Sequence, residues 1–192
     1  MRAMSMTMEA SEKFHFTQND YNTNHSIDRG RPMRRMITFD EDHIRFTNRI
    51  VGVAFDRDRV LLHRTDGMKF WALPGGRAEL LEPSPQTLVR EMQEEIGVEV
   101  RVERLLWVAE NFFIYGPRQH HELGFYFLMH LPPDSPLRNQ TSFVGHEGDM
   151  DVHFEWHPVA TLENVILYPT FLRTGLKSLP AATTHIIHID SD

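Results

Sequence analysis

Hydrophobic positions along this chain occur in short runs separated by polar turns, a pattern that predicts strands. Two apolar runs, Ile50–Phe55 and Val60–Arg64, are separated by the polar residues Asp56 to Asp58, which indicates a hairpin. Three further stretches have the composition or the alternation of strands: Glu99–Val108, Glu122–Met129 and Asp151–Trp156. We expect a turn at Tyr115–Pro117 and a proline-rich loop over Leu131–Asn139.

One segment, Ser84–Ile96, has the hydrophobic spacing of a helix. Its apolar residues return on a single helix face: Leu88, Val89, Met92 and Ile96. Pro85 lies in the first turn, where a missing N–H costs little, and Gly97 suits the left-handed residue that ends a helix. A second helix is predicted from Pro169 to about Leu179. Because strands and helices alternate along the chain, we expect an α/β fold.

The pattern also predicts how the chain is divided. Residues 1–43 are polar and weakly patterned, so we expect a flexible leader with a short element near Met36–Phe39. The compact domain is expected over residues 44–180. Residues 181–192 form the expected C-terminal tail, in which His185–Ile189 alternate but are too few to assign.

Composition narrows the function classes. The net charge of −7 argues against a nucleic-acid partner, since such proteins carry a basic face. A local basic cluster consists of Arg29, Arg31, Arg34 and Arg35; we interpret it as part of a solvated leader, with a phosphate-binding arm as the alternative. The absence of cysteine excludes disulfides, thiol catalysis and cysteine-type zinc sites. With no long apolar run and no signal-peptide core, we expect no membrane span and a cytoplasmic location.

Three glutamates share one side of the predicted helix. Glu91, Glu94 and Glu95 stand at positions i, i+3 and i+4, next to the apolar face. Like charges at this spacing cost roughly 0.2–0.5 kcal/mol per pair even when they are exposed. A divalent cation removes this cost, and an all-oxygen ligand set favours Mg²⁺ or Mn²⁺. The alternative is a solvated acidic helix face.

The residues around these glutamates decide between the two interpretations, because the segment resembles the Nudix box. That family pattern is a glycine, five residues, a glutamate, seven residues, then Arg-Glu-apolar-x-Glu-Glu-x-Gly-apolar. The matching positions are Gly76, Glu82, Arg90, Glu91, Met92, Glu94, Glu95, Gly97 and Val98. Trp71 to Gly75 is similar to the usual lead-in. Leu81 departs from the family, where many members have a glycine, and this indicates a looser loop before Glu82.

The resemblance implies a fold and a set of roles. Family members share an α/β/α sandwich with a mixed β-sheet. By position, the expected metal ligands are Glu91, Glu94, Glu95 and the carbonyl of Gly75. Arg90 and Glu82 would orient the glutamates. Glu94 and Glu95 are the catalytic candidates of the helix, with the choice of general base left open.

Members of the family often use a further acid from a distant loop. Glu147 is the first candidate, because its glycine-flanked loop is similar to one that supplies a glutamate in MutT-like members. Glu122 and Glu155 are the alternatives. For each of the three, the alternative interpretation is a surface carboxylate.

Weaker signals lie outside the box. His120 and His121 are interpreted as turn residues beside core aromatics, with base stacking and phosphate contact as the alternative. A zinc site built on the alternating His153, Glu155 and His157 is a minor alternative. Trp71 is expected to pack in the fold rather than to stack on a substrate.

The expected activity is hydrolysis of a phosphoanhydride bond in a small nucleotide-type substrate, with a second copy of the chain as a candidate partner in a homodimer. Dinucleoside polyphosphates and ADP-ribose are alternative substrates; Tyr115 is weak support for the former. A nucleotide-sensing module without catalysis is the alternative of another class, and an RNA-cap-type hydrolase conflicts with the acidic charge.

Overall fold

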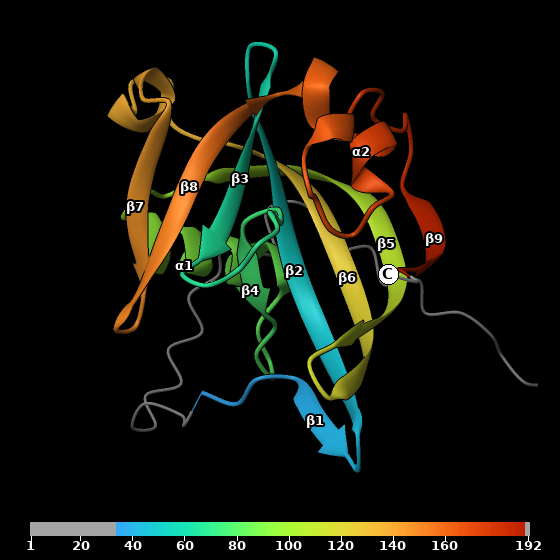
Figure 1. The fold of residues 1–192 in the computed structure, drawn as a ribbon. Helices are drawn as coiled ribbons and strands as arrows, with labels where there is room; N and C mark the ends of the chain where they lie inside the picture. The colour runs from blue at the N-terminus through green and yellow to red at the C-terminus, as the bar shows by residue number, and fades with distance from the viewer. Residues whose placement is uncertain (1–33, 191–192) are drawn as a thin grey trace, which may run out of the picture. The chain divides into compact units, whose positions relative to one another are not determined.

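Long strands form the frame of the computed structural model, which describes residues 34–190 (Figure 1). The strands are β1 Thr38–Glu41, β2 Ile44–Asp56, β3 Arg59–Thr65, β4 Gly75–Arg77, β5 Arg101–Tyr115, β6 Arg118–His130, β7 Ser142–Glu147, β8 Met150–Pro158 and β9 Thr184–Ile189. The helical elements are α1 Ser84–Ile96, η2 Pro136–Asn139, η3 Val159–Asn164 and α2 Leu172–Gly175.

The sheet is mixed. Its strand order is β7-β8-β3-β2-β6-β5-β9, and β1 and β4 both pair with β2 outside this path. The β2–β6 and β5–β9 pairs are parallel, whereas the remaining pairs are antiparallel. Figure 1 shows β9 beside β5 at one edge and β7 beside β8 at the other.

Apolar side chains cover both faces of this sheet. On one face, Leu88 and Met92 of α1 are fully buried in a cluster with Ile50 and Phe154. On the other face, a second cluster includes side chains from η3 and α2, such as the fully buried Leu162. Helical elements therefore flank the sheet on both sides, which confirms the predicted α/β/α sandwich.

The helix that carries the box begins and ends where the sequence predicts. Pro83 is its N-cap residue, and Gly97 adopts a left-handed conformation with φ of 68°. The Gly97 N–H donates to the carbonyl of Gln93, and the Val98 N–H reaches the carbonyl of Met92. These bonds satisfy carbonyls that the last helical turn leaves free.

Several predicted elements differ from the structure. The β2–β3 hairpin is confirmed, but β5 and β6 are much longer than predicted and continue to a tight turn at Gly116 and Pro117. His120 and His121 therefore lie within β6, so their interpretation as turn residues is wrong. Each ring stacks on an aromatic side chain of β5: His120 on Phe113 and His121 on Phe112. Strand β7 was not predicted at all, because its sequence is short and mostly exposed.

The second predicted helix is too long. Helix α2 contains only Leu172–Gly175 instead of the segment from Pro169 to Leu179. The N–H groups of Leu172 and Arg173 bond to carbonyls three residues back, as in a tight turn. The Thr170 hydroxyl donates to Asp190 at 2.6 Å, which holds the start of the segment against the end of β9.

The predicted domain boundaries are too narrow at both ends. Strand β1 lies within the predicted leader and pairs with β2, and β9 lies within the predicted tail and pairs with β5. Both strands are short and mostly exposed, so their sequence pattern is weak. The leader prediction for residues 1–33 lies outside the described residues. In the part of the chain that is described, no helix has the length and apolarity needed to cross a membrane. A cytoplasmic location stays a prediction from sequence.

Candidate active site

Arg90 is the centre of the polar side of α1. Its Nε and Nη2 donate to the two carboxylate oxygens of Glu82 at 2.9 and 3.0 Å. Its Nη1 donates to Glu91 at 2.8 Å and to Glu94 at 3.2 Å. The arginine therefore ties the loop before α1 to two glutamates of the helix. This is the arrangement expected of an orienting arginine.

Glu91 is held between Arg90 and the glycine that opens the box. A Cβ atom built on Gly76 would lie 2.0 Å from the carboxylate carbon of Glu91, so any other residue here would displace this carboxylate. Burial raises the pKa of Glu91, and Arg90 opposes this effect. The absence of a side chain at Gly76 thus lets a carboxylate lie against the backbone.

Glu95 is the most enclosed acid of the site. It is 5% exposed, and its Oε2 atom is buried without a hydrogen-bond partner among the described residues. Burial, followed by the charge of Glu91, raises the pKa of Glu95 to about 8. A buried carboxylate without a partner is costly, and a bound cation would remove that cost.

The carbonyl of Gly75 lies at the edge of the same site. Gly75 has φ of 139°, and a Cβ atom there would lie 2.1 Å from the carbonyl oxygen of Ile50, so only glycine fits. Its carbonyl oxygen accepts a hydrogen bond from Arg49 Nη2 at 3.0 Å.

Arg49 is a site residue that the sequence reasoning missed. It lies on β2, and its positive charge lowers the pKa values of Glu91 and Glu95 against their burial. A signal was present, because Arg49 alternates in phase with Val51 and Val53, whose side chains are buried. An arginine at an inward position of a strand needs a partner, and the carbonyl oxygen of Gly75 provides one.

Arg34 also reaches the site. Its Nη1 lies 2.5 Å from Glu94 Oε1, and its Nε lies 3.8 Å from Glu79. The interpretation of the basic cluster as solvated leader is therefore wrong for this residue, although its side chain remains 58% exposed. Arg29 and Arg31 lie outside the described residues.

The three candidates for the distant acid occupy different places. Glu147 ends β7, is exposed, and is close enough to Glu95 for its charge to raise the pKa of that residue. Strand β7 packs on the end of α1, since a Cβ atom on Gly145 would lie 2.3 Å from the carbonyl oxygen of Glu95. Glu155 lies 3.4 Å from His157, and no contact with a box residue is recorded for it in residues 34–190. The structure thus brings Glu147 nearest to the box.

Glu122 belongs to a second polar group. It pairs in register with Thr47 of β2 and with Asn111 of β5, so the three side chains form a row across the sheet. Burial raises the pKa of Glu122. Asn111 is 3% exposed, and its Oδ1 atom has no partner among residues 34–190. Arg49 influences both groups, because its positive charge lowers the pKa of Glu122 as well as the pKa values of Glu91 and Glu95.

The remaining sequence candidates do not converge on the box. His153 bonds to Asp66 at 2.7 Å, away from His157, which argues against the zinc alternative. Trp71 is half-buried, packs on His157 and stacks under Arg64, as its predicted packing role requires. His120 stacks on Phe113 with 4.7 Å between ring centroids.

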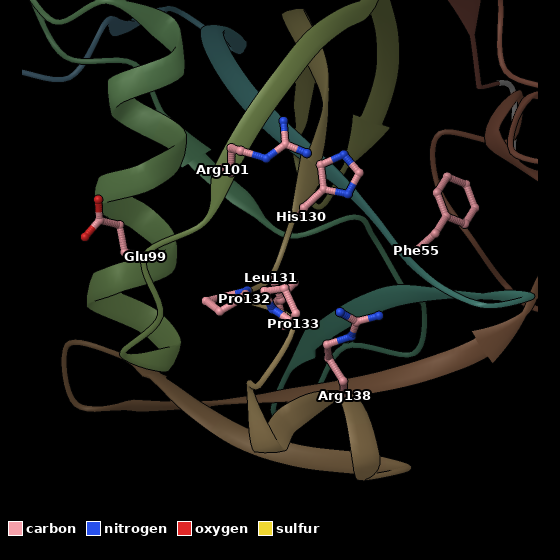
Figure 2. A pocket seen from close by; sticks show the side chains of 8 residues that line it. All are labelled: Phe55, Glu99, Arg101, His130, Leu131, Pro132, Pro133 and Arg138. Atoms are coloured by element: carbon pink, nitrogen blue, oxygen red, sulfur yellow. The ribbon is translucent and has the colours of Figure 1, made fainter. Parts of the chain in front are cut away.

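A cavity of about 300 Å³ lies elsewhere in the fold and contains no box residue (Figure 2). Figure 2 shows Arg101, His130 and Arg138 around it. Arg138 pairs with Asp56 at 3.0 Å, and His130 pairs with Glu103 at 2.5 Å. Arg101 lies 3.8 Å from Glu103 as well, so each of these cationic groups is paired with an acid.

The box residues fit a hard divalent cation in their chemistry. The donors are carboxylates and a carbonyl, and one buried oxygen of Glu95 lacks a partner. Within residues 34–190, however, no three His, Asp or Glu side chains lie in an arrangement that could already hold a metal. In this arrangement Glu91 is paired with Arg90, and Glu94 is paired with Arg90 and Arg34.

Comparison with known proteins agrees with the resemblance to the Nudix family. The model of the NUDIX domain matches residues 46–175. An 8-oxo-dGTP diphosphatase from Proteus vulgaris is 37% identical over 78 residues, which are 40% of this chain and 66% of that protein. Two further curated relatives are 30% and 29% identical and match over 47% and 55% of their own lengths. The chain thus spans about half to two thirds of the length of these relatives.

Solved structures share the fold. A NUDIX hydrolase from Nitrosomonas europaea superimposes with a TM-score of 0.54 at 16% identity, covering 75% of this chain and 79% of that one. An ADP-ribose pyrophosphatase from Streptococcus suis gives a TM-score of 0.52 at 18% identity, covering 73% and 98%. The family model extends over most of the described sheet and includes the whole box. The chain therefore belongs to the Nudix family.

Proposed function

We propose that this chain hydrolyses a phosphoanhydride bond in a nucleotide-type substrate with the help of Mg²⁺ or Mn²⁺. The observation that carries the proposal is the buried carboxylate of Glu95, whose Oε2 atom has no partner among the described residues. Glu91, Glu94, Glu95 and the carbonyl of Gly75 would hold the cation. When bound, a divalent cation polarises phosphate oxygens and lowers the pKa of a coordinated water.

The side chains of the site have distinct tasks in this proposal. Arg90 orients Glu91 and Glu94 and is itself fixed by Glu82. Glu95 or Glu94 accepts the proton of the attacking water, and Glu147 completes the acid set from the end of β7. Arg49, which lies beside Gly75, supplies positive charge near the phosphates. A general base of this kind contributes roughly 10²–10⁴-fold to the rate.

The substrate class rests on relatives. The Proteus relative is named for 8-oxo-dGTP and the Streptococcus structure for ADP-ribose, so nucleoside triphosphates and nucleoside diphosphates linked to another group are both candidates. A dinucleoside polyphosphate is a third candidate. A sensing module without catalysis is the competing function, but a sensor does not require the full set of box carboxylates that this chain keeps.

The experiment is a phosphate-release screen of the full chain with Mg²⁺. Its substrates are dNTPs, oxidised dNTPs, ADP-ribose, dinucleoside polyphosphates, nucleotide sugars and CDP-alcohols. We expect turnover of at least one of them, loss of turnover in EDTA, recovery with Mg²⁺ or Mn²⁺, and little recovery with Ca²⁺, which prefers more ligands and looser geometry. Full activity in EDTA would contradict the metal assignment. Tight nucleotide binding without turnover would favour the sensor.

A further inference from the structure

A row of apolar and aromatic side chains crosses one face of the sheet. Phe39, Phe46, His121, Phe112 and Ile189 are register partners in sequence from β1 through β2, β6 and β5 to β9. Ring centroids are 5.1 Å apart between Phe39 and Phe46, 5.2 Å between Phe46 and His121, and 4.6 Å between His121 and Phe112. We call these five residues the aromatic row.

The described elements leave much of this face uncovered. Phe39 is 59% exposed and Ile189 is 67% exposed at the two ends of the row. The neighbouring Ile44, Ile114 and Ile187 are 42%, 70% and 67% exposed, and strand alternation places them on the same face. Contiguous exposed apolar surface of this kind is typical of an interaction site.

Among residues 34–190, strand β9 is an unprotected edge strand at one end of the aromatic row. It is the last strand of the sheet order, and its sequence from Thr184 to Ile189 contains no lysine, proline or acid. The Asp190 N–H bonds to the Phe112 carbonyl, so by alternation the backbone groups of Ile187 and Ile189 point to the open side. An exposed apolar edge that lacks lysine, proline and acidic residues is prone to pair with another strand.

The opposite edge of the sheet differs. Strand β7 ends in the charged Glu147, and Gly145 packs closely against the end of α1. Charged residues and covering elements are the usual protection of edge strands. The asymmetry between the two edges marks β9, not β7, as the site for a further strand.

We propose that two copies of this chain associate through β9, with the two β9 strands antiparallel across a two-fold axis. A second copy fits because an edge strand is complementary to itself in this arrangement. The protein carries a net charge of −7, but the two acids beside the edge have partners: Asp190 is buried and accepts a hydrogen bond from Thr170, and Glu110 is paired with His185 at 2.8 Å. The contact therefore brings together isoleucine side chains and His185 instead of like charges.

The geometry gives a specific register. If Ile187 faces its own copy as a hydrogen-bonded pair, the two Cα atoms are about 5.5 Å apart. Ile189 of each copy then faces His185 of the other, and the two aromatic rows become one continuous face. The box lies toward the β7 end of the sheet, so this association does not depend on the proposed hydrolysis.

The first experiment measures the mass of the full chain by sedimentation equilibrium. We expect a dimer for the natural sequence and a monomer for the double variant Ile187→Lys/Ile189→Lys, which places charge on the outer face of β9. The matched control is Val144→Lys/Met150→Lys at the other edge, where the natural residues are 51% and 55% exposed. The control should remain dimeric.

The second experiment uses the absence of cysteine from the chain. A single Ile187→Cys substitution should give a disulfide-linked dimer under mild oxidation, because about 5.5 Å between Cα atoms suits a disulfide. Val144→Cys should remain unlinked. This test does not require the lysine variant to fold.

Three results would overturn the proposal. One is a monomer for the natural sequence at all soluble concentrations. Another is a dimer that both lysine variants preserve equally, with no cross-link through residue 187. The last is a monomer whose Ile187 and Ile189 amides resist hydrogen exchange, since another part of the chain would then cover the edge. Each result would leave the hydrolase proposal untouched.

Discussion

The carboxylate of Glu91 lies directly against Gly76, where a Cβ atom would stand 2.0 Å from its carboxylate carbon. The first prediction follows from this contact. Gly76→Ala should displace Glu91 from Arg90 and lower kcat at least tenfold, because metal ligands tolerate little movement. Steady-state kinetics at saturating Mg²⁺ would measure the loss. The control is Gly175→Ala, whose Cβ atom would meet its nearest neighbour, the Trp107 side chain, at 3.3 Å. Equal activity of both variants would contradict the argument.

Leu81 adopts φ of 65° and is fully exposed, at the position where many family members have glycine. This left-handed conformation favours glycine, so the leucine is strained, and the looser loop stays a prediction. This strain destabilises the folded state by roughly 1–2 kcal/mol. A glycine would avoid the strain, but it loses more conformational freedom on folding, which costs roughly 0.5–1 kcal/mol.

We accordingly predict that Leu81→Gly raises the free energy of unfolding by up to about 1 kcal/mol. No packing is lost, because the side chain contacts solvent only. Leu80→Gly is the matched control, since Leu80 is exposed but has no positive φ, and it should destabilise the protein. Urea denaturation of both variants measures the difference. A destabilised Leu81→Gly would show that the leucine has a contact in solution.

The local pattern was sufficient to predict α1 and its C-cap, whereas the orienting role of Arg90 was implied only by the resemblance to the Nudix family. The helix and its cap depend on residues within one turn of each other. Arg49 escaped prediction because its partner, the carbonyl of Gly75 on β4, is far along the chain. Strand β9 escaped for a similar reason, since only its pairing with β5 makes six alternating residues into a strand. Contacts between residues far apart in the sequence therefore determine the place of Arg49 and the formation of β9, and a local pattern does not reveal them.

Glu95→Gln should lower kcat by roughly a hundredfold or more while the fold remains intact. The carboxylate is enclosed and the amide has nearly the same shape, so the loss would come from charge and proton transfer. Circular dichroism and thermal unfolding check the fold. Glu99→Gln, just beyond the end of α1 and exposed, is the control and should retain activity. Near-normal turnover by a folded Glu95→Gln would refute the role.

His63 should make stability depend on pH. Burial, and to a lesser degree Arg49, lowers the pKa of His63 to about 3, and its Nδ1 atom has no partner in residues 34–190. The unfolded chain takes up a proton near pH 6.5, whereas the folded chain does so near pH 3. Stability should therefore fall as the pH decreases from about 6.5, by at most ~1.4 kcal/mol per pH unit from this group.

The measurement is urea denaturation of the natural chain and of His63→Gln between pH 7 and pH 5, above the usual carboxylate range. Glu95, whose pKa is raised to about 8, opposes the decrease equally in both proteins, so the difference between them reports on His63. His63→Gln should show a shallower decrease. His157 also has a lowered pKa through burial, so some decrease will remain in the variant. Identical slopes for the two proteins would mean that His63 is protonated in the fold.

Glu147 and Glu122 compete for the role of distant acid, and their surroundings predict different kinetics. Glu147 is exposed at the end of β7, with Gly148 at φ of 60° in the turn that follows, so it can approach the box when substrate binds. Glu147→Gln should depress kcat strongly and KM little, because its contact matters mainly in the transition state.

Glu122 lies in the row with Thr47 and Asn111; if it contacts the substrate, this buried position makes the contact the same in the ground state and the transition state. Glu122→Gln should therefore raise KM more than it lowers kcat, and Glu155→Gln should be the mildest change. If Glu122→Gln instead abolishes kcat and Glu147→Gln is silent, then Glu122 is the distant acid, while the assignment of the box glutamates stands.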